Sequence, residues 1–230
     1  MKYCIVNGDD FGAHEGINRG IHEAHERGIL TSTSLMMNMP GTADAVRIGR
    51  RTPGLSVGIH LHLAAEAGGA RVDASATHAC ATKLERQVEQ FHDMMGRLPT
   101  HVDSHHNIHR LPTLRPLFLD LAGRHGIPLR ENSPVRYFSS FYGRWGGETH
   151  PEQIGVSQLL HMLETEFGDG FTELSCHPGY VHPGFATGYA REREIEVATL
   201  CDPRVRRALE ELDIHLISYQ DLGSLLEEAS

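Results

Sequence analysis

The sequence predicts an α/β fold in which a parallel sheet closes into a TIM-barrel-like, irregular (β/α) barrel with about seven strands. Apolar runs of strand length alternate with helix-like segments along the chain, which is typical of parallel strands joined by helical crossovers. Seven such units favour a barrel over an open doubly wound sheet. Reactive side chains also follow several strands directly, as they do at the mouth of a barrel.

Each predicted strand is a short apolar run followed by turn residues. The runs cover residues 3–7, 32–37, 55–60, 100–103, 128–130, 172–176 and 214–218. The segments between them have the polar pattern of surface helices. They cover residues 15–27, 42–51, 84–95, 113–125, 153–167, 192–212 and 220–228. We expect Pro203 to break the helix at 192–212, because proline has no backbone N–H to donate.

Composition restricts both the organisation and the partners of the chain. No repeat, low-complexity tract or linker divides it, so we expect residues 1–230 to form a single domain. The formal net charge of -9 argues against nucleic acid as a partner, since nucleic-acid binding requires clustered Lys and Arg. The first apolar run is too short for a signal peptide or a membrane span, so we expect a cytoplasmic protein without membrane insertion.

The four cysteines are scattered without a CxxC pair, which is typical of reduced thiols rather than of a disulfide framework or a cysteine-ligated zinc site. The sequence leaves the oligomeric state open, with a homodimer as one alternative.

Five reactive residues fall at the carboxyl ends of predicted strands. Asp9 and Asp10 follow the first strand, and His60 ends the third. His105 follows the fourth strand and His177 the sixth. Because the carboxyl ends of barrel strands meet on one face, we expect these distant residues to form one cluster.

The first motif is Asn-Gly-Asp-Asp-Phe-Gly at residues 7–12. Two adjacent carboxylates repel each other unless a cation lies nearby. A metal ion resolves this conflict, because one carboxylate ligates it and the other remains free to handle a proton. The alternative is an Asp-rich loop that caps the next helix.

The second motif, residues 58–63, alternates so that His60 and His62 share one face of a strand. A lone strand histidine is more often a hydrogen-bonded core residue than a ligand. Two histidines on the face that ends at a barrel mouth favour a functional role.

The third motif, residues 101–109, holds the densest group of histidines. An extended backbone would align His101, Asp103 and His105 on one face. Imidazole is the commonest metal ligand, and a carboxylate behind it fixes its tautomer, which is the role expected of Asp103. The alternative is a solvated polar loop.

The fourth motif is Ser-Cys-His-Pro-Gly-Tyr at residues 175–180. Neighbours on a strand point to opposite faces, so Cys176 and His177 cannot easily form the ion pair of a thiol nucleophile. We therefore interpret His177 as a proton donor at the rim of the site. The alternative is a turn histidine without a role.

Together the motifs Asn-Gly-Asp-Asp-Phe-Gly, Val-Gly-Ile-His-Leu, Thr-His-Val-Asp-Ser-His-His and His-Pro-Gly-Tyr resemble those of the YdjC-like carbohydrate deacetylases. This group includes chitooligosaccharide deacetylases and hopanoid-associated proteins. The resemblance extends in the right order from residue 3 to about residue 222. It implies a barrel-like fold, a divalent metal held by one aspartate and two histidines, and removal of an N-acetyl group from an amino sugar or a short acetylated oligosaccharide.

Carried over by position, the resemblance assigns Asp10, His60 and His105 as metal ligands, Asp9 as the general base and His177 as the general acid. The residue patterns select the same side chains. The patterns alone do not indicate acetate or a sugar.

The chain departs from the family pattern at two positions. His62 stands where the family commonly has asparagine, and Asn107 replaces the third histidine of the Asp-Ser-His-His-His run. The segment 64–79 is also shorter and richer in small residues than the corresponding family loop, and we expect it to border the pocket. We expect His62 to contact substrate, because a fourth protein ligand would leave less room for water and substrate. Arg130, which ends the fifth predicted strand, is a second candidate for orienting the substrate.

The nitrogen-rich ligand set favours zinc over magnesium, which prefers oxygen ligands. Magnesium, cobalt and nickel remain alternatives. Two other functions also remain: a metal-dependent hydrolase of a different small N-acyl compound, and a sugar- or metal-binding protein without turnover. A spare carboxylate at Asp9 argues against the latter, because binding alone needs no base.

Overall fold

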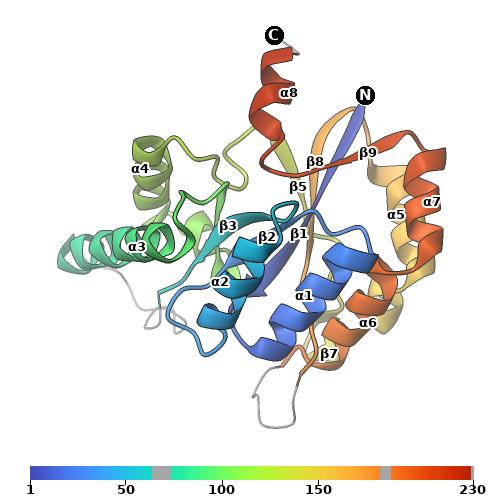
Figure 1. Cartoon of the computed structure of the whole chain (residues 1–230), viewed down its shortest axis with the longest axis horizontal. Coiled ribbons are helices and arrows are strands. Elements are labelled where there is room, and N and C mark those ends of the chain that lie inside the picture. Colours follow the sequence, from blue (N-terminus) through green and yellow to red (C-terminus); the bar gives the residue numbers. More distant parts are fainter. Residues whose placement is uncertain (64–73, 182–187, 229–230) are drawn as a thin grey trace.

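The computed structural model describes residues 1–63, 74–181 and 188–228. A parallel sheet of seven strands lies at its centre (Figure 1). The first strand, β1 (Lys2–Phe11), pairs along one side with β8 (Gly170–Cys176). Its other side is shared, since β9 (Ile214–Ile217) pairs with its first half and β2 (Ser32–Leu35) with its second.

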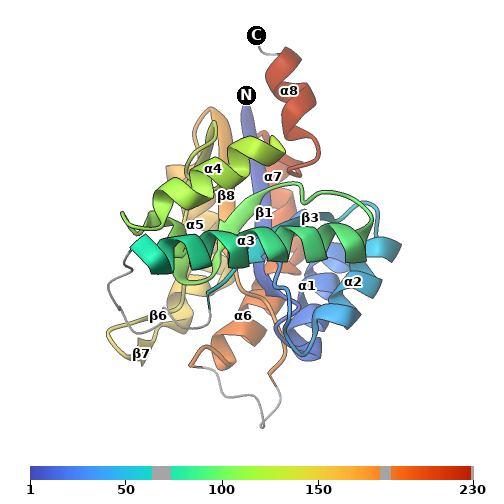
Figure 2. The ribbon, with the colours of Figure 1, turned by 90° about the vertical axis from the view of Figure 1, so that its left-hand side faces the viewer.

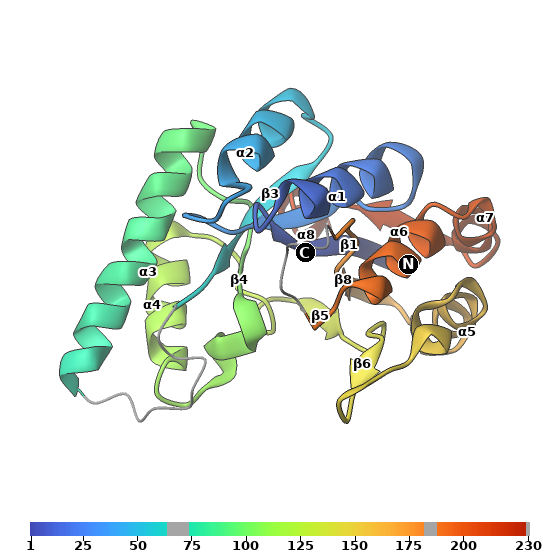
Figure 3. The same cartoon turned by 90° about the horizontal axis from the view of Figure 1, so that it is seen from below.

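The remaining strands extend the sheet at both edges. β3 (Ser56–Leu61) and β4 (Val102–Ser104) continue it beyond β2, and β5 (Val135–Phe138) pairs with β8. The order is β4-β3-β2-β1-β8-β5, and every pair is parallel. The carboxyl ends of all these strands therefore lie at one end of the sheet, and this end faces the viewer in Figure 3.

The sheet curls into a half-barrel. A parallel bridge between Val102 and Leu129 brings the chain after β4 alongside that strand. The next residue, Arg130, forms ion pairs inside the curve with carboxylates of β1, β4 and β8. A single side chain reaches three strands only because the sheet is curled. The predicted irregular (β/α) barrel is thus confirmed.

Helices cover the outer face of the half-barrel (Figures 1 and 2). They are α1 (Glu15–Arg27), α2 (Thr42–Arg51), α3 (Ala74–Met95), α4 (Arg115–His125), α5 (Val156–Glu166), α6 (Arg191–Leu200) and α7 (Pro203–Glu211). The last helix, α8 (Leu222–Glu228), stands at the amino end of the strands (Figure 1), and short 3-10 helices η1 (His105–Arg110) and η2 (Pro151–Ile154) precede α4 and α5. The apolar faces of the covering helices form the core against the strands, with Ile17, Ile21, Phe91 and Phe118 almost fully buried. Within the described residues, no helix has the length and apolar character needed to cross a membrane.

The predicted break at Pro203 is confirmed, because α6 ends at Leu200 and α7 begins at Pro203. Asp202 caps α7 by accepting a hydrogen bond from the backbone N–H of Arg204 at 2.9 Å. Proline fits the first helical position, where its missing N–H would have no partner in the helix.

The fifth predicted strand, 128–130, is corrected. This segment makes only one bridge to β4, and the backbone leaves the extended conformation at Glu131, whose φ is 61°. The strand that extends the sheet is β5, a few residues later. A small antiparallel hairpin, β6 (Arg144–Trp145) with β7 (Glu148–Thr149), was also not predicted.

Candidate active site

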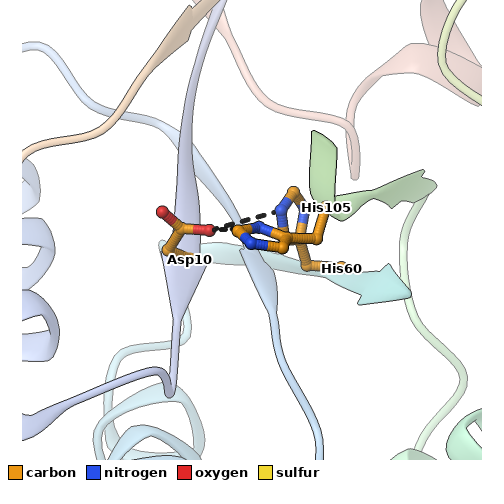
Figure 4. A group of neighbouring side chains, drawn as sticks. All are labelled: Asp10, His60 and His105. Carbon is orange, nitrogen blue, oxygen red and sulfur yellow. Dashed lines mark hydrogen bonds and ion pairs between the residues drawn. The ribbon is translucent and has the colours of Figure 1, made fainter. Parts of the chain in front are cut away.

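Three predicted ligands converge at the carboxyl end of the sheet (Figure 4). Asp10 comes from β1, His60 from β3 and His105 from the start of η1. Donor atoms of these side chains all lie within 4.8 Å of one another. Asp10 Oδ1 is 3.4 Å from His60 Nε2 and 3.2 Å from His105 Nδ1. One carboxylate oxygen and two imidazole nitrogens form a donor set that suits a divalent transition metal.

An irregularity in β1 places both adjacent aspartates on the site. Neighbouring side chains of a regular strand point to opposite faces. Here the pairing of β1 with β2 shifts register between Gly8 and Phe11, and Asp10 has a left-handed φ of 69°. Asp9 and Asp10 consequently both line the cavity. A strained backbone at a non-glycine residue is common where function requires a particular side-chain direction.

His60 is oriented by a buried carboxylate. Asp103 Oδ1 lies 2.7 Å from His60 Nδ1, which leaves Nε2 directed at Asp10. Burial opposes protonation of His60, but the charge of Asp103 and hydrogen bonds to Asp10 and Asp103 outweigh burial and raise the pKa of His60 to about 10. In the metal-free protein this imidazole is therefore protonated at neutral pH. A metal ion would replace that proton.

Asp9 is held in the ionised form by Arg130. The guanidinium donates to both carboxylate oxygens, at 2.9 and 2.8 Å, and Asn7 Nδ2 donates to Asp9 Oδ1 at 2.8 Å. Burial alone would raise the pKa of Asp9, but the charge of Arg130 outweighs burial and lowers it. Arg130 also donates to Glu173. Asp9 is thus a fixed carboxylate on the floor of the cavity.

A second group with ligand atoms in range, Asp9, His60 and Asp103, already has a cation. Arg130 Nη2 lies 2.8 Å from Asp9 Oδ1 and 2.8 Å from Asp103 Oδ2. Because the guanidinium already neutralises both carboxylates, a metal ion would gain little electrostatic stabilisation there. Asp10, His60 and His105 are therefore the better metal candidate.

Arg193 on α6 is a site residue that sequence reasoning missed. Its Nη2 donates to Asp10 Oδ2 at 2.5 Å, on the oxygen that does not face the histidines. Burial alone would raise the pKa of Asp10, but the charge of Arg193 and hydrogen bonds from His105 and His60 outweigh burial and hold that pKa well below its usual range. Arg193 and Asp10 are 183 residues apart, and the arginine stands in a charged helical stretch that resembles any solvated face.

His177 lies across the site from the ligands. Its Nε2 is 3.9 Å from Asp9 Oδ2, its backbone N–H donates to Glu196, and burial lowers the pKa of the imidazole. Its Nδ1 is buried without a hydrogen-bond partner among the described residues. The neighbouring Cys176 points away, with its Sγ 3.2 Å from the carbonyl of Asn7, and burial raises the pKa of that thiol well above its usual range. This geometry agrees with the exclusion of a thiol nucleophile.

A cavity of about 700 Å³ joins these groups. All five residues predicted to form the catalytic and metal-binding set line it, namely Asp9, Asp10, His60, His105 and His177. Its outer wall includes tyrosines and arginines from the segments around β5, β6 and α6. A metal donor set, a carboxylate fixed by Arg130 and an imidazole therefore face one space large enough for a small molecule.

The two residues predicted to contact substrate lie elsewhere. The imidazole of His62 donates through Nε2 to the carbonyl of Met37 at 2.8 Å, and His62 is not among the described residues that line the cavity. Arg130 is fully buried below Asp9, so it can influence a substrate only through its carboxylate partners. The segment 64–79 that follows His62 lies partly outside the described residues, and its place at the rim stays a prediction.

Comparisons with known proteins cover almost the whole chain. Residues 3–211 match the family model described as YdjC-like protein. The carbohydrate deacetylase of Geobacillus stearothermophilus is 33% identical, with 97% of this chain and 99% of that protein covered. The chitooligosaccharide deacetylase of Yersinia enterocolitica is also 33% identical, with 96% and 99% covered. A crystal structure from Enterococcus faecalis, provisionally described as a cellobiose-phosphate cleavage protein, aligns with a TM-score of 0.79 at 27% identity and covers 96% of this chain and 98% of that chain.

Proposed function

Because the chain belongs to the YdjC-like family, we propose that it is a metal-dependent hydrolase that removes the N-acetyl group from an amino sugar or a short acetylated oligosaccharide. One observation carries the chemistry: Asp10, His60 and His105 share a cavity with Asp9 and His177. Substrate class rests on the relatives, whose names describe deacetylation of carbohydrates and chitooligosaccharides.

Asp10, His60 and His105 would hold one divalent metal ion. Three protein ligands leave positions open for water and substrate, as a catalytic site requires. When bound, such an ion lowers the pKa of a water molecule and polarises a carbonyl oxygen. The two imidazoles favour zinc, while magnesium, cobalt and nickel are the alternatives to test.

Asp9 would act as the general base. It reaches the cavity, it is ionised, and its carboxylate is fixed by Arg130 and Asn7. A fixed, charged oxygen beside the ligand set can accept the proton of an attacking water without first rearranging. Arg130 therefore acts as a positioning residue for the base.

His177 would protonate the departing amine. An amide nitrogen leaves poorly unless it gains a proton. Because burial lowers the pKa of His177, the imidazole would be neutral before the reaction and would pass on to the amine the proton that Asp9 takes from water. His177 Nε2 lies 3.9 Å from Asp9 Oδ2, so the proposed acid and base are neighbours that border one cavity. An acetamide in the cavity beside them would be within reach of both groups.

The test is acetate release from N-acetylglucosamine and its short β-linked oligomers by purified protein reloaded with zinc, cobalt, nickel or magnesium. We expect release with at least one metal and loss of release after chelation. A panel of acyclic N-acyl amines serves as the comparison. Acetate release from those amines alone would move the substrate class away from sugars, and no release from any compound would contradict the proposal.

A further inference from the structure

Two tyrosine rings form a flat stack on the wall of the cavity. Tyr142 lies in the loop between β5 and β6, and Tyr189 lies just before α6. Their ring centroids are 4.8 Å apart, and their planes differ by only 3°. Both residues line the cavity. The pair therefore offers a bound molecule the face of one ring, supported from behind by the other.

The inner ring of this stack is fixed and the outer ring is open. Tyr189 is buried, its hydroxyl donates to Glu196 at 2.5 Å, and it accepts from the backbone N–H of Gly143 at 2.9 Å. Tyr142 is 39% exposed. Because Tyr189 covers one face of Tyr142, the exposed area belongs mainly to the opposite face and the rim. Among the described residues no second ring stacks on that face, which borders the cavity and can contact a ligand there.

His177 stands beside both rings. Its imidazole centroid is 5.7 Å from that of Tyr142 and 5.6 Å from that of Tyr189, at interplanar angles of 64° and 62°. The proton donor of the proposed reaction is therefore next to the aromatic surface. A leaving amine at His177 would bring the ring that carries it close to Tyr142.

The charged groups on the same wall already have partners. Arg110 donates to both carboxylate oxygens of Glu131, at 2.6 and 3.0 Å, and Arg144 lies 3.7 Å from Glu192. Both arginines line the cavity. A wall of paired charges and an aromatic face suits an uncharged ring better than a phosphorylated or acidic one.

We propose that the free face of Tyr142 is the binding platform for the pyranose ring of the amino sugar on the leaving-group side of the scissile amide. The inference rests on the proposed deacetylation and specifies which part of the substrate is held. One face of a pyranose carries mainly C–H bonds, whose hydrogens are slightly positive, and the π face of a tyrosine is slightly negative. The ring, not the hydroxyl, supplies the contact.

The test compares Tyr142→Ala and Tyr142→Phe with the wild-type, metal-loaded protein. Calorimetry, at a pH above the pKa of the sugar amines, measures binding of the disaccharide of glucosamine, which is then uncharged, carries no acetyl group and is not turned over. We expect Tyr142→Ala to weaken binding about tenfold and Tyr142→Phe to stay within about twofold, because phenylalanine keeps the ring. Equal weakening in both variants would overturn the platform in favour of a hydroxyl contact, and unchanged binding in Tyr142→Ala would overturn it outright.

Trp145→Ala is the matched control. Trp145 is also aromatic and exposed, but it stacks on His150 and is not one of the described cavity-lining residues. The affinity of Trp145→Ala for the disaccharide should equal that of the wild type. An equal loss in Trp145→Ala and Tyr142→Ala would indicate a general disturbance of the segment and contradict a specific platform.

Kinetics separate this inference from the proposed function. With the N-acetylated disaccharide, Tyr142→Ala should raise KM about tenfold with a smaller effect on kcat, while Tyr142→Phe should keep a KM within about twofold of the wild type. If the wild type releases acetate from no sugar, the proposed function fails. Calorimetry with the N-acetylated disaccharide then decides the platform by the same comparison of Tyr142→Ala with Tyr142→Phe.

Discussion

Asp9→Asn removes the proposed base while preserving the shape of the side chain. The amide cannot accept the proton of water, and removal of a general base typically lowers the rate by about 10²–10⁴. The same change also removes one of the carboxylates that neutralise Arg130. Glu173 and Asp103 remain beside the guanidinium, so we expect a loss in unfolding free energy of only about 1–3 kcal/mol.

Glu173→Gln separates these two effects. Glu173 accepts from Arg130 at 2.9 Å and from the hydroxyl of Tyr219 at 2.7 Å, yet it is not one of the described residues that line the cavity. This variant disturbs the same guanidinium and leaves Asp9 in place. We expect a stability loss similar to that of Asp9→Asn and a kcat within about tenfold of the wild type.

The assay is steady-state acetate release by metal-loaded protein, with thermal unfolding and metal content measured on the same samples. A large fall in kcat for Asp9→Asn alone, at unchanged metal content, supports the base. Equal falls in both variants would refute the reasoning, because the loss would then come from the network around Arg130.

Three further predictions follow from the contacts. His62→Asn should leave the metal content and KM unchanged, because the imidazole bonds to the Met37 carbonyl and is not among the described residues that line the cavity. Loss of metal would make His62 a ligand, and an altered KM would support the predicted substrate contact. Gly58→Ala should lower the unfolding free energy by about 1–3 kcal/mol, because a Cβ at Gly58 would overlap the His101 imidazole and lie 2.6 Å from the His101 carbonyl oxygen. Thermal unfolding measures the stability loss. An unchanged unfolding midpoint would contradict the close packing of Gly58 on His101. Metal binding at pH 7 should release about one proton from His60, whose pKa in the metal-free protein is about 10, so the apparent affinity for metal should rise as pH increases toward 10. Calorimetry in buffers of different ionisation enthalpy measures the proton release. A metal affinity independent of pH would contradict this expectation.

The fold was predictable where sequence and local structure agree. The strand and helix alternation required parallel pairing, and the strand ends required one shared site. The segment 128–130 was misread because its apolar pattern is that of a strand, whereas the backbone turn at Glu131 limits it to a bridge. The hairpin around Gly146 and Gly147 had a local signal, since two glycines of positive φ suit a two-residue turn.

Motifs that bring several reactive residues to one strand end identified the central site residues. Arg193 was missed because its partner Asp10 is distant in sequence and its helical neighbours are charged. His62 was placed on the face of His60 by strand alternation, but β3 ends at Leu61, so strand alternation no longer fixes the side-chain direction at His62. A single motif cannot predict a contact that depends on how separate segments pack.

Metal content of histidine variants tests the central claim most directly. Wild type, His60→Ala, His105→Ala and the control His106→Ala are purified, loaded with zinc and measured by elemental analysis after desalting. His106 adjoins His105, with ring centroids 3.9 Å apart, but it is not part of the three-residue donor set. We expect about one ion per chain in the wild type and in His106→Ala, and loss of tight binding in the other two with the fold retained. Full occupancy in both His60→Ala and His105→Ala would contradict the metal site.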